Sequence, residues 1–108
     1  NLETQTVAEG GGIDFAGKPG TEVVAVAAGV VTRSERESGY GNVVEIRHTR
    51  GYSTLYAHNK ENKVEVGDVV EKGETIALLG STGRSSGPHV HFEVHRNGRH
   101  LDPRRFVR

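Results

Sequence analysis

The chain has 108 residues, which is enough for one domain with a buried core and too few for two. Its 14 Lys and Arg residues balance its 14 Asp and Glu residues. The chain has no basic block, which excludes charge-driven binding to nucleic acid, and no acidic tail, which excludes an acidic disordered chain. The absence of Cys excludes disulfide scaffolds, thiol catalysis and Cys-based zinc sites. No apolar run reaches the roughly 20 residues of a membrane span. A signal-peptide pattern is absent, and a start at Asn1 instead of Met is expected for an excised domain or a processed product.

The predicted elements are nearly all β-strands. Gly is frequent, 15 residues of 108, and no useful apolar stripe of helical period occurs, which indicates short strands joined by tight turns. Asn97-Gly98 predicts a two-residue hairpin turn. The pattern predicts a single all-β domain over 1–108, a small antiparallel sandwich or partly open barrel. In chain order we expect an irregular arm over 1–11 and strands over 22–27, 29–36, 42–48, 52–58, 63–66, 75–79 and 89–96.

The segment His89-Val90-His91 opens the last long strand. Because successive side chains of a strand point to opposite faces, His89 and His91 share one face while Val90 points to the core. Two imidazoles about 7 Å apart along a strand can serve one zinc site, as two ligands or as a ligand and a neighbouring acid or base. Two histidines on a solvated strand face are the simpler alternative.

Two further segments favour a metal site. Ile13-Asp14-Phe15 places a carboxylate on the face opposite two apolar side chains, and Tyr56-Ala57-His58 ends another alternating strand in an imidazole. A catalytic zinc normally takes three protein ligands and a water molecule. Asp14 and His91 are the best candidates for metal ligands, because apolar neighbours pointing the other way would hold both rigidly.

His58 and His89 then remain as a general base and a general acid. One would take a proton from a metal-bound water, and the other would stabilise the oxyanion or protonate the leaving amine. Glu93 shares the face of these strand histidines and could hydrogen-bond an imidazole. The remaining histidines are expected to be surface residues: His48, His95 and His100.

A series of short motifs runs from about Gly12 to Pro103. This ordered set resembles the lysostaphin-type, or LytM-like, zinc metallopeptidases, which cut peptidoglycan cross-bridges and stem peptides. The resemblance implies a zinc cofactor, peptidoglycan peptides as substrates, and a location in the periplasm or cell envelope. The motifs are Gly12-Ile13-Asp14-Phe15-Ala16, Pro19-Gly20-Thr21, Gly39-Tyr40-Gly41-Asn42, Tyr56-Ala57-His58, Gly80-Ser81-Thr82-Gly83-Arg84, Ser86-Gly87-Pro88-His89-Val90-His91-Phe92-Glu93 and Asp102-Pro103.

The resemblance also implies residue roles. Asp14 and His91 match family zinc ligands, and His58 and His89 match the family's catalytic pair, in agreement with the assignment from strand alternation. One position departs from the family: four residues before Asp14, where the family has its first ligand His, this chain has Gly10. Two of the three family ligands are therefore present.

Three explanations for Gly10 remain open. The neighbouring Glu9 could supply a carboxylate, or the segment 1–10 could differ from the natural loop. Alternatively, the domain has lost catalysis and binds the cell wall or activates a cell-wall amidase, as degenerate family members do. Because the other catalytic positions are intact, a zinc endopeptidase is the favoured prediction. The segment 66–76 also resembles the hairpin of a biotinyl or lipoyl carrier, but such a carrier typically has a Met-Lys-Met turn and this chain has no Met.

Overall fold

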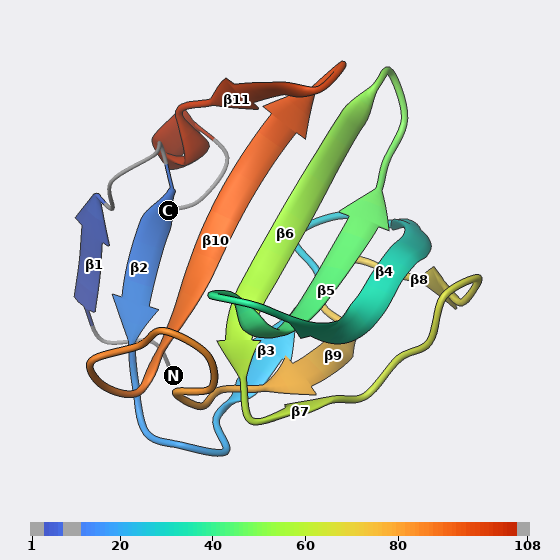
Figure 1. The fold of residues 1–108 in the computed structure, drawn as a ribbon. Coiled ribbons are helices and arrows are strands. Elements are labelled where there is room, and N and C mark those ends of the chain that lie inside the picture. Colours follow the sequence, from blue (N-terminus) through green and yellow to red (C-terminus); the bar gives the residue numbers. More distant parts are fainter. Residues whose placement is uncertain (1–3, 8–11, 106–108) are drawn as a thin grey trace.

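The computed structural model describes residues 4–7 and 12–105, which form two antiparallel β-sheets packed against each other (Figure 1). In the larger sheet the strand order is β1-β2-β10-β6-β5-β4-β8, with β11 also paired to β10. The smaller sheet has the order β3-β9-β7. The strands are β1 (Thr4–Val7), β2 (Ile13–Ala16), β3 (Glu22–Val24), β4 (Gly29–Glu37), β5 (Gly41–Arg47), β6 (Tyr52–Asn59), β7 (Glu61–Asn62), β8 (Val69–Val70), β9 (Thr75–Leu78), β10 (His89–Arg96) and β11 (Arg99–Leu101), followed by the short 3-10 helix η1 (Pro103–Arg105).

This architecture confirms the predicted all-β antiparallel fold, as a sandwich that does not close into a barrel. The Asn97-Gly98 hairpin is confirmed as well: both residues have positive φ, 50° and 81°, and Arg96 pairs with Arg99 across the turn. Positive φ at both central positions matches the twist of the flanking strands, and Asn and Gly tolerate it best.

Two predictions about short segments are wrong, and one short strand is missing from the prediction. Thr4–Val7 form strand β1 instead of part of an irregular arm, while 1–3 and 8–11 lie outside the described residues. The strand expected over 63–66 is not formed, and the pairing segment is Glu61–Asn62 instead. The two-residue strand Val69–Val70 was not predicted. Two-residue strands are too short to show a period, so only their partners, β9 and β4, define them.

The main core lies between the two sheets. Even-numbered residues of β10 point into it, and Val90, Phe92 and Val94 are each at most 3% exposed. The smaller sheet contributes residues such as Val23 and Ile76 to the same apolar cluster. The odd-numbered residues of β10 therefore lie on the outer face of the larger sheet, as strand alternation predicts.

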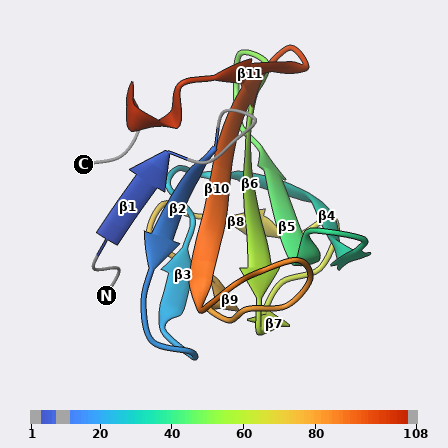
Figure 2. The same ribbon diagram turned by 60° about the vertical axis from the view of Figure 1, so that its left-hand side comes forward.

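Strand β10 lies inside the larger sheet, between β6 on one edge and two strands on the other. Its first half, His89 to Phe92, pairs with β2, and its last part, Val94 to Arg96, pairs with β11 (Figure 2). Polar side chains on the outer face of β10 can therefore contact residues of β2, β6 and β11. Within the described part of the chain, no helix is long and apolar enough to cross a membrane.

Candidate functional site

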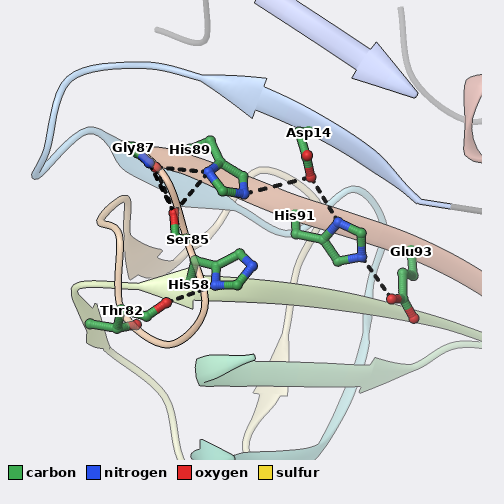
Figure 3. A network of polar contacts seen from close by, with 8 residues as sticks. All are labelled: Asp14, His58, Thr82, Ser85, Gly87, His89, His91 and Glu93. Carbon is green, nitrogen blue, oxygen red and sulfur yellow. Dashed lines mark hydrogen bonds and ion pairs between the residues drawn. The ribbon is translucent and has the colours of Figure 1, made fainter. Parts of the chain in front are cut away.

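Asp14 and His91 lie directly opposite each other on β2 and β10. Their neighbours Ile13 and Phe92 face the core, so both polar side chains project from the outer face of the sheet. Asp14 Oδ1 lies 2.7 Å from His91 Nδ1 (Figure 3). The strand register thus brings together the two residues that the sequence suggested as metal ligands.

Glu93 lies on the other side of the His91 ring. Its Oε2 atom is 2.7 Å from His91 Nε2 and accepts a 2.9 Å hydrogen bond from the Tyr40 hydroxyl. The contact between Glu93 and an imidazole, left open by the sequence, is therefore present. Burial lowers the pKa of His91, but its hydrogen bonds to Glu93 and Asp14 outweigh this effect, so the pKa of His91 is raised.

The site has features expected of a residue pair that binds a metal. A metal-bound histidine usually has its second ring nitrogen held by a carboxylate, as Glu93 holds His91. Two ligands of a tetrahedral zinc are about 3.3 Å apart, so Asp14 and His91 would separate by about half an ångström to admit the ion. Asp14 and His91 therefore fit as two zinc ligands. Gly10 and Glu9, the positions in question for a third ligand, lie outside the described residues.

His58 reaches this site because its backbone leaves the regular strand. In an undistorted β6, His58 would share the inward face of Tyr56, but its φ is +67° and the pairing of β5 with β6 is irregular between Asn42 and Val44. A left-handed backbone is uncommon for His and is found where surrounding contacts hold it. Here Tyr40 O accepts from the His58 N–H at 2.8 Å, and the His58 carbonyl accepts from the Thr82 N–H at 3.3 Å.

The His58 ring is oriented by its hydrogen bond to Thr82. Nδ1 donates to the Thr82 carbonyl at 2.7 Å, so in the neutral ring Nε2 carries the lone pair. Its ring centroid is 4.7 Å from that of His89 and 6.1 Å from that of His91. Burial is the main cause that lowers the pKa of His58, which favours the neutral, basic form of the ring near pH 7.

His89 is held at the end of the loop 80–88. Its Nδ1 donates to the Gly87 carbonyl at 2.8 Å, while its Nε2 lies 3.7 Å from Asp14 Oδ1 (Figure 3). A pocket of about 290 Å³ opens beside it, lined by Asp14, Ala16, Ser86, Gly87, Pro88 and His89. Of the four residues singled out in the sequence, Asp14 and His89 line this pocket. His91 contacts Asp14, and the His58 ring lies next to the rings of His89 and His91.

The motif Gly39–Asn42 packs closely against Thr82 and so holds the loop 80–88 against the sheet. Gly41 has φ +68°, and a Cβ there would come within 2.4 Å of Thr82. The Thr82 hydroxyl accepts from the Asn42 N–H at 3.0 Å and donates to the Asn59 carbonyl at 2.7 Å. The close approach explains why Gly is needed in the Gly39–Asn42 motif, and it places the Thr82 carbonyl that orients His58.

The expectation for the other histidines is partly wrong. His48 bridges the Ala28 carbonyl at 2.7 Å and the Thr54 hydroxyl at 2.8 Å, so it has a structural role and is not simply solvated. His95 is half-buried and contacts Glu93 at 2.8 Å, whereas His100 is exposed as expected. Sequence alternation could have indicated the position of His95, because it shares the face of His91 and Glu93.

Gly12 leaves the space that the His91 ring occupies. A Cβ at position 12 would lie 2.3 Å from His91 Cε1, and this ring cannot yield because carboxylates hold both of its nitrogens. We expect Gly12→Ala to destabilise the protein by about 1–3 kcal/mol, the usual cost of overpacking, and to weaken zinc binding. Thermal unfolding with chelator and with zinc measures both effects. Gly87→Ala is the control, because a Cβ there meets nothing within 4 Å, and equal effects of the two substitutions would contradict the prediction.

The His91–Glu93 pair gives the metal-free protein a pH-dependent stability. Burial raises the pKa of Glu93, but hydrogen bonds from His91, His95 and Tyr40 lower it to about 2, so its stabilisation is full above the ordinary value of 4.5 and is lost as the pH falls toward 2. The raised pKa of His91 acts in the opposite sense: its contribution is full below 6.5 and is lost as the pH rises through the folded-state value. The pair therefore stabilises most between pH 4.5 and 6.5.

We expect Glu93→Gln to lower the free energy of unfolding by about 2 kcal/mol or more within this window, because hydrogen bonds to charged groups are the strong ones. The loss should be smaller at both lower and higher pH. Urea unfolding of both proteins in chelator measures the difference, and a difference that is constant with pH would contradict this assignment of charges.

Residues 8–103 match the family model described as Peptidase family M23. DD-carboxypeptidase/endopeptidase Mpg of Neisseria meningitidis is 50% identical over 92 residues, which are 85% of this chain and 21% of that protein. Murein hydrolase activator NlpD of Escherichia coli is 40% identical over 109 residues, 98% of this chain and 28% of that protein. The chain thus spans between 21% and 28% of the length of these two relatives.

The fold matches a solved member of the same group. The catalytic domain of lysostaphin from Staphylococcus simulans superposes with a TM-score of 0.83 at 33% identity, covering 89% of this chain and 77% of that one. This likeness confirms the resemblance to lysostaphin-type peptidases that the motifs indicated. Because the family model covers nearly the whole chain and the fold agrees, the chain belongs to peptidase family M23.

Proposed function

We propose that this protein is a zinc-dependent endopeptidase that hydrolyses peptide bonds of peptidoglycan in the periplasm or cell envelope. The observation that carries the proposal is that Asp14, His58, His89 and His91 form one cluster, in which Asp14 and His89 line a pocket and Glu93 lies behind His91. Family membership and the endopeptidase named among the relatives support it.

Asp14 and His91 would hold the zinc ion. When bound, zinc polarises a carbonyl and lowers the pKa of a coordinated water toward about 7. Glu93 would keep His91 in place by accepting from Nε2, which leaves Nδ1 and its lone pair directed at the metal. Tyr40 in turn donates to Glu93 and holds the carboxylate.

His58 is the better candidate for the general base. Its Nε2 lone pair is free to accept a proton, because Nδ1 is occupied by the Thr82 carbonyl, and its lowered pKa favours the neutral ring. The Nδ1 of His89 donates to the Gly87 carbonyl, so its Nε2 carries a proton only in the imidazolium form. As an imidazolium beside the Asp14 carboxylate, His89 would donate from Nε2 to the developing oxyanion or pass that proton to the leaving amine. The two rings are close enough to act on one peptide group.

A second candidate function is activation of a cell-wall amidase, or binding to the wall, without catalysis. Two observations favour it. The relative named a murein hydrolase activator matches 98% of this chain. In addition, Gly10 stands where the resemblance calls for a third ligand, and a glycine has no side chain to donate.

Isolated peptidoglycan distinguishes the two functions. The protein is purified without chelator or added metal, its zinc is measured by elemental analysis, and it is incubated with peptidoglycan alone and with a cell-wall amidase. The endopeptidase proposal predicts at least one zinc ion per chain and cut peptides without the amidase. Both the zinc and the cut peptides should be lost on chelation. Release of intact stem peptides that requires both the amidase and this protein, with no cut peptides from this protein alone, would favour the activator and contradict the endopeptidase.

A further inference from the structure

A second cluster of polar side chains lies further along the outer face of β10. His95 and His100 are directly opposite each other on β10 and β11, just as His91 and Asp14 are opposite each other on β10 and β2. Glu93 lies between the two pairs, two residues from each β10 histidine. Its Oε2 atom contacts His91, whereas its Oε1 atom faces the second pair.

The atoms of this second cluster are close to one another. His95 Nε2 lies 2.8 Å from Glu93 Oε1, and His100 Nε2 lies 4.0 Å from the same oxygen. The ring centroids of His95 and His100 are 4.1 Å apart. One ligand atom from each of the three residues can be chosen so that all lie within 4.8 Å of one another.

We propose that Glu93, His95 and His100 form a second metal site, for a divalent ion of the zinc, copper or nickel class. Imidazole nitrogens select these ions over magnesium and calcium, which prefer sites made of oxygen alone. The inference goes beyond the proposed peptidase function and does not require it.

Binding of a metal ion would require only small movements of the Glu93, His95 and His100 side chains. Ligands of a tetrahedral zinc lie about 3.3 Å apart, because each zinc bond is about 2.0–2.2 Å long. The contact of 2.8 Å would lengthen slightly, and the contact of 4.0 Å would shorten by less than about 1 Å. The His100 side chain is 46% exposed and free to make this adjustment, while the nearly buried Glu93, 5% exposed, provides the rigid part of the site.

Both sites can be filled together, since each uses a different oxygen of Glu93. A metal on Oε1 leaves Oε2 in place to hold His91. The carboxylate would then connect the two sites, with the second ion drawing electron density from the group that orients His91. The remaining coordination positions of the second ion face solvent beside His100 and would take water.

Zinc titration calorimetry in an Asp14→Ala background isolates the second site. Asp14 contacts His89 and His91, whereas Glu93 contacts His91, His95 and His100, so this background weakens the Asp14–His91 site alone. We expect one zinc ion to bind the Asp14→Ala protein. Adding His100→Ala should weaken that binding at least about tenfold, because loss of a residue that only supports a metal ligand already costs about 10–100-fold in affinity.

Arg99→Ala in the same background is the matched control. Arg99 is the exposed neighbour of His100 on β11 and, by strand alternation, its side chain lies on the opposite face. It should leave the zinc affinity unchanged. Thermal unfolding in chelator checks that all three proteins are folded, which is expected because His100 is exposed. Equal zinc affinity with and without His100→Ala would overturn the proposal, as would absence of zinc binding by the folded Asp14→Ala protein.

Discussion

Replacing His91 with alanine in a His100→Ala protein, which lacks the proposed second metal site, is expected to abolish both zinc binding and peptidoglycan hydrolysis. His91 offers Nδ1 to the proposed metal position, and its loss leaves Asp14 as the remaining proposed ligand among the described residues. A single carboxylate is too few donors for a catalytic zinc, which normally has three protein ligands. Elemental analysis after dialysis, together with release of peptides from peptidoglycan, measures the two effects.

His58→Ala and His89→Ala should behave differently from His91→Ala. Both should retain zinc while turnover falls by about two orders of magnitude or more, the usual scale for loss of an acid or base. Full zinc retention in the folded protein that carries both His91→Ala and His100→Ala would remove His91 from the metal site. Loss of zinc in His58→Ala would instead make His58 a ligand and overturn its assignment as the base.

Gly10→His is expected to tighten zinc binding and to create or increase peptidoglycan hydrolysis. If position 10 is the ligand position that the resemblance implies, the new imidazole would join Asp14 and His91 and complete a three-ligand site with room for water. Proton transfer needs no further change, because His58 and His89 are already beside the site. Since metal binds the folded form preferentially, thermal stability in zinc should rise as well.

Calorimetric titration with zinc gives the direct measurement for Gly10→His. Gly10, Gly11 and Gly12 follow one another, so ordering this segment costs conformational entropy and reduces the gain in affinity. A gain should nevertheless remain. Gly10→Gln is the matched control, because it adds a side chain without an imidazole. Identical zinc affinity for Gly10→His and the parent protein would mean that residue 10 is not the ligand position.

Much of the fold could be predicted from local patterns. The strand over 89–96 was predicted with the observed limits, and the strands over 29–36, 42–48 and 52–58 were within about one residue of the observed ones. Long alternating segments can be predicted because their side chains point in turn to the two faces of the sheet over many residues. The strands Glu61–Asn62 and Val69–Val70 could not be predicted in this way, because their strand conformation comes from pairing with β9 and β4.

Strand alternation alone is enough to assign Asp14 and His91 to the outer face of the sheet. Alternation with Ile13, Phe15, Val90 and Phe92 is a local property of the chain, and burial of the apolar side chains leaves the polar ones on the outer face.

The roles of His58 and Glu93 in the site depend on long-range contacts of the folded chain. Alternation alone would turn His58 inward with Tyr56, and the left-handed backbone held by Tyr40 and Thr82 turns it to the site instead. The two contacts of Glu93, with His91 and with the His95–His100 pair, depend on side-chain rotation and on β11 returning beside β10. These features depend on contacts between segments far apart in the chain, which a period of two residues does not encode.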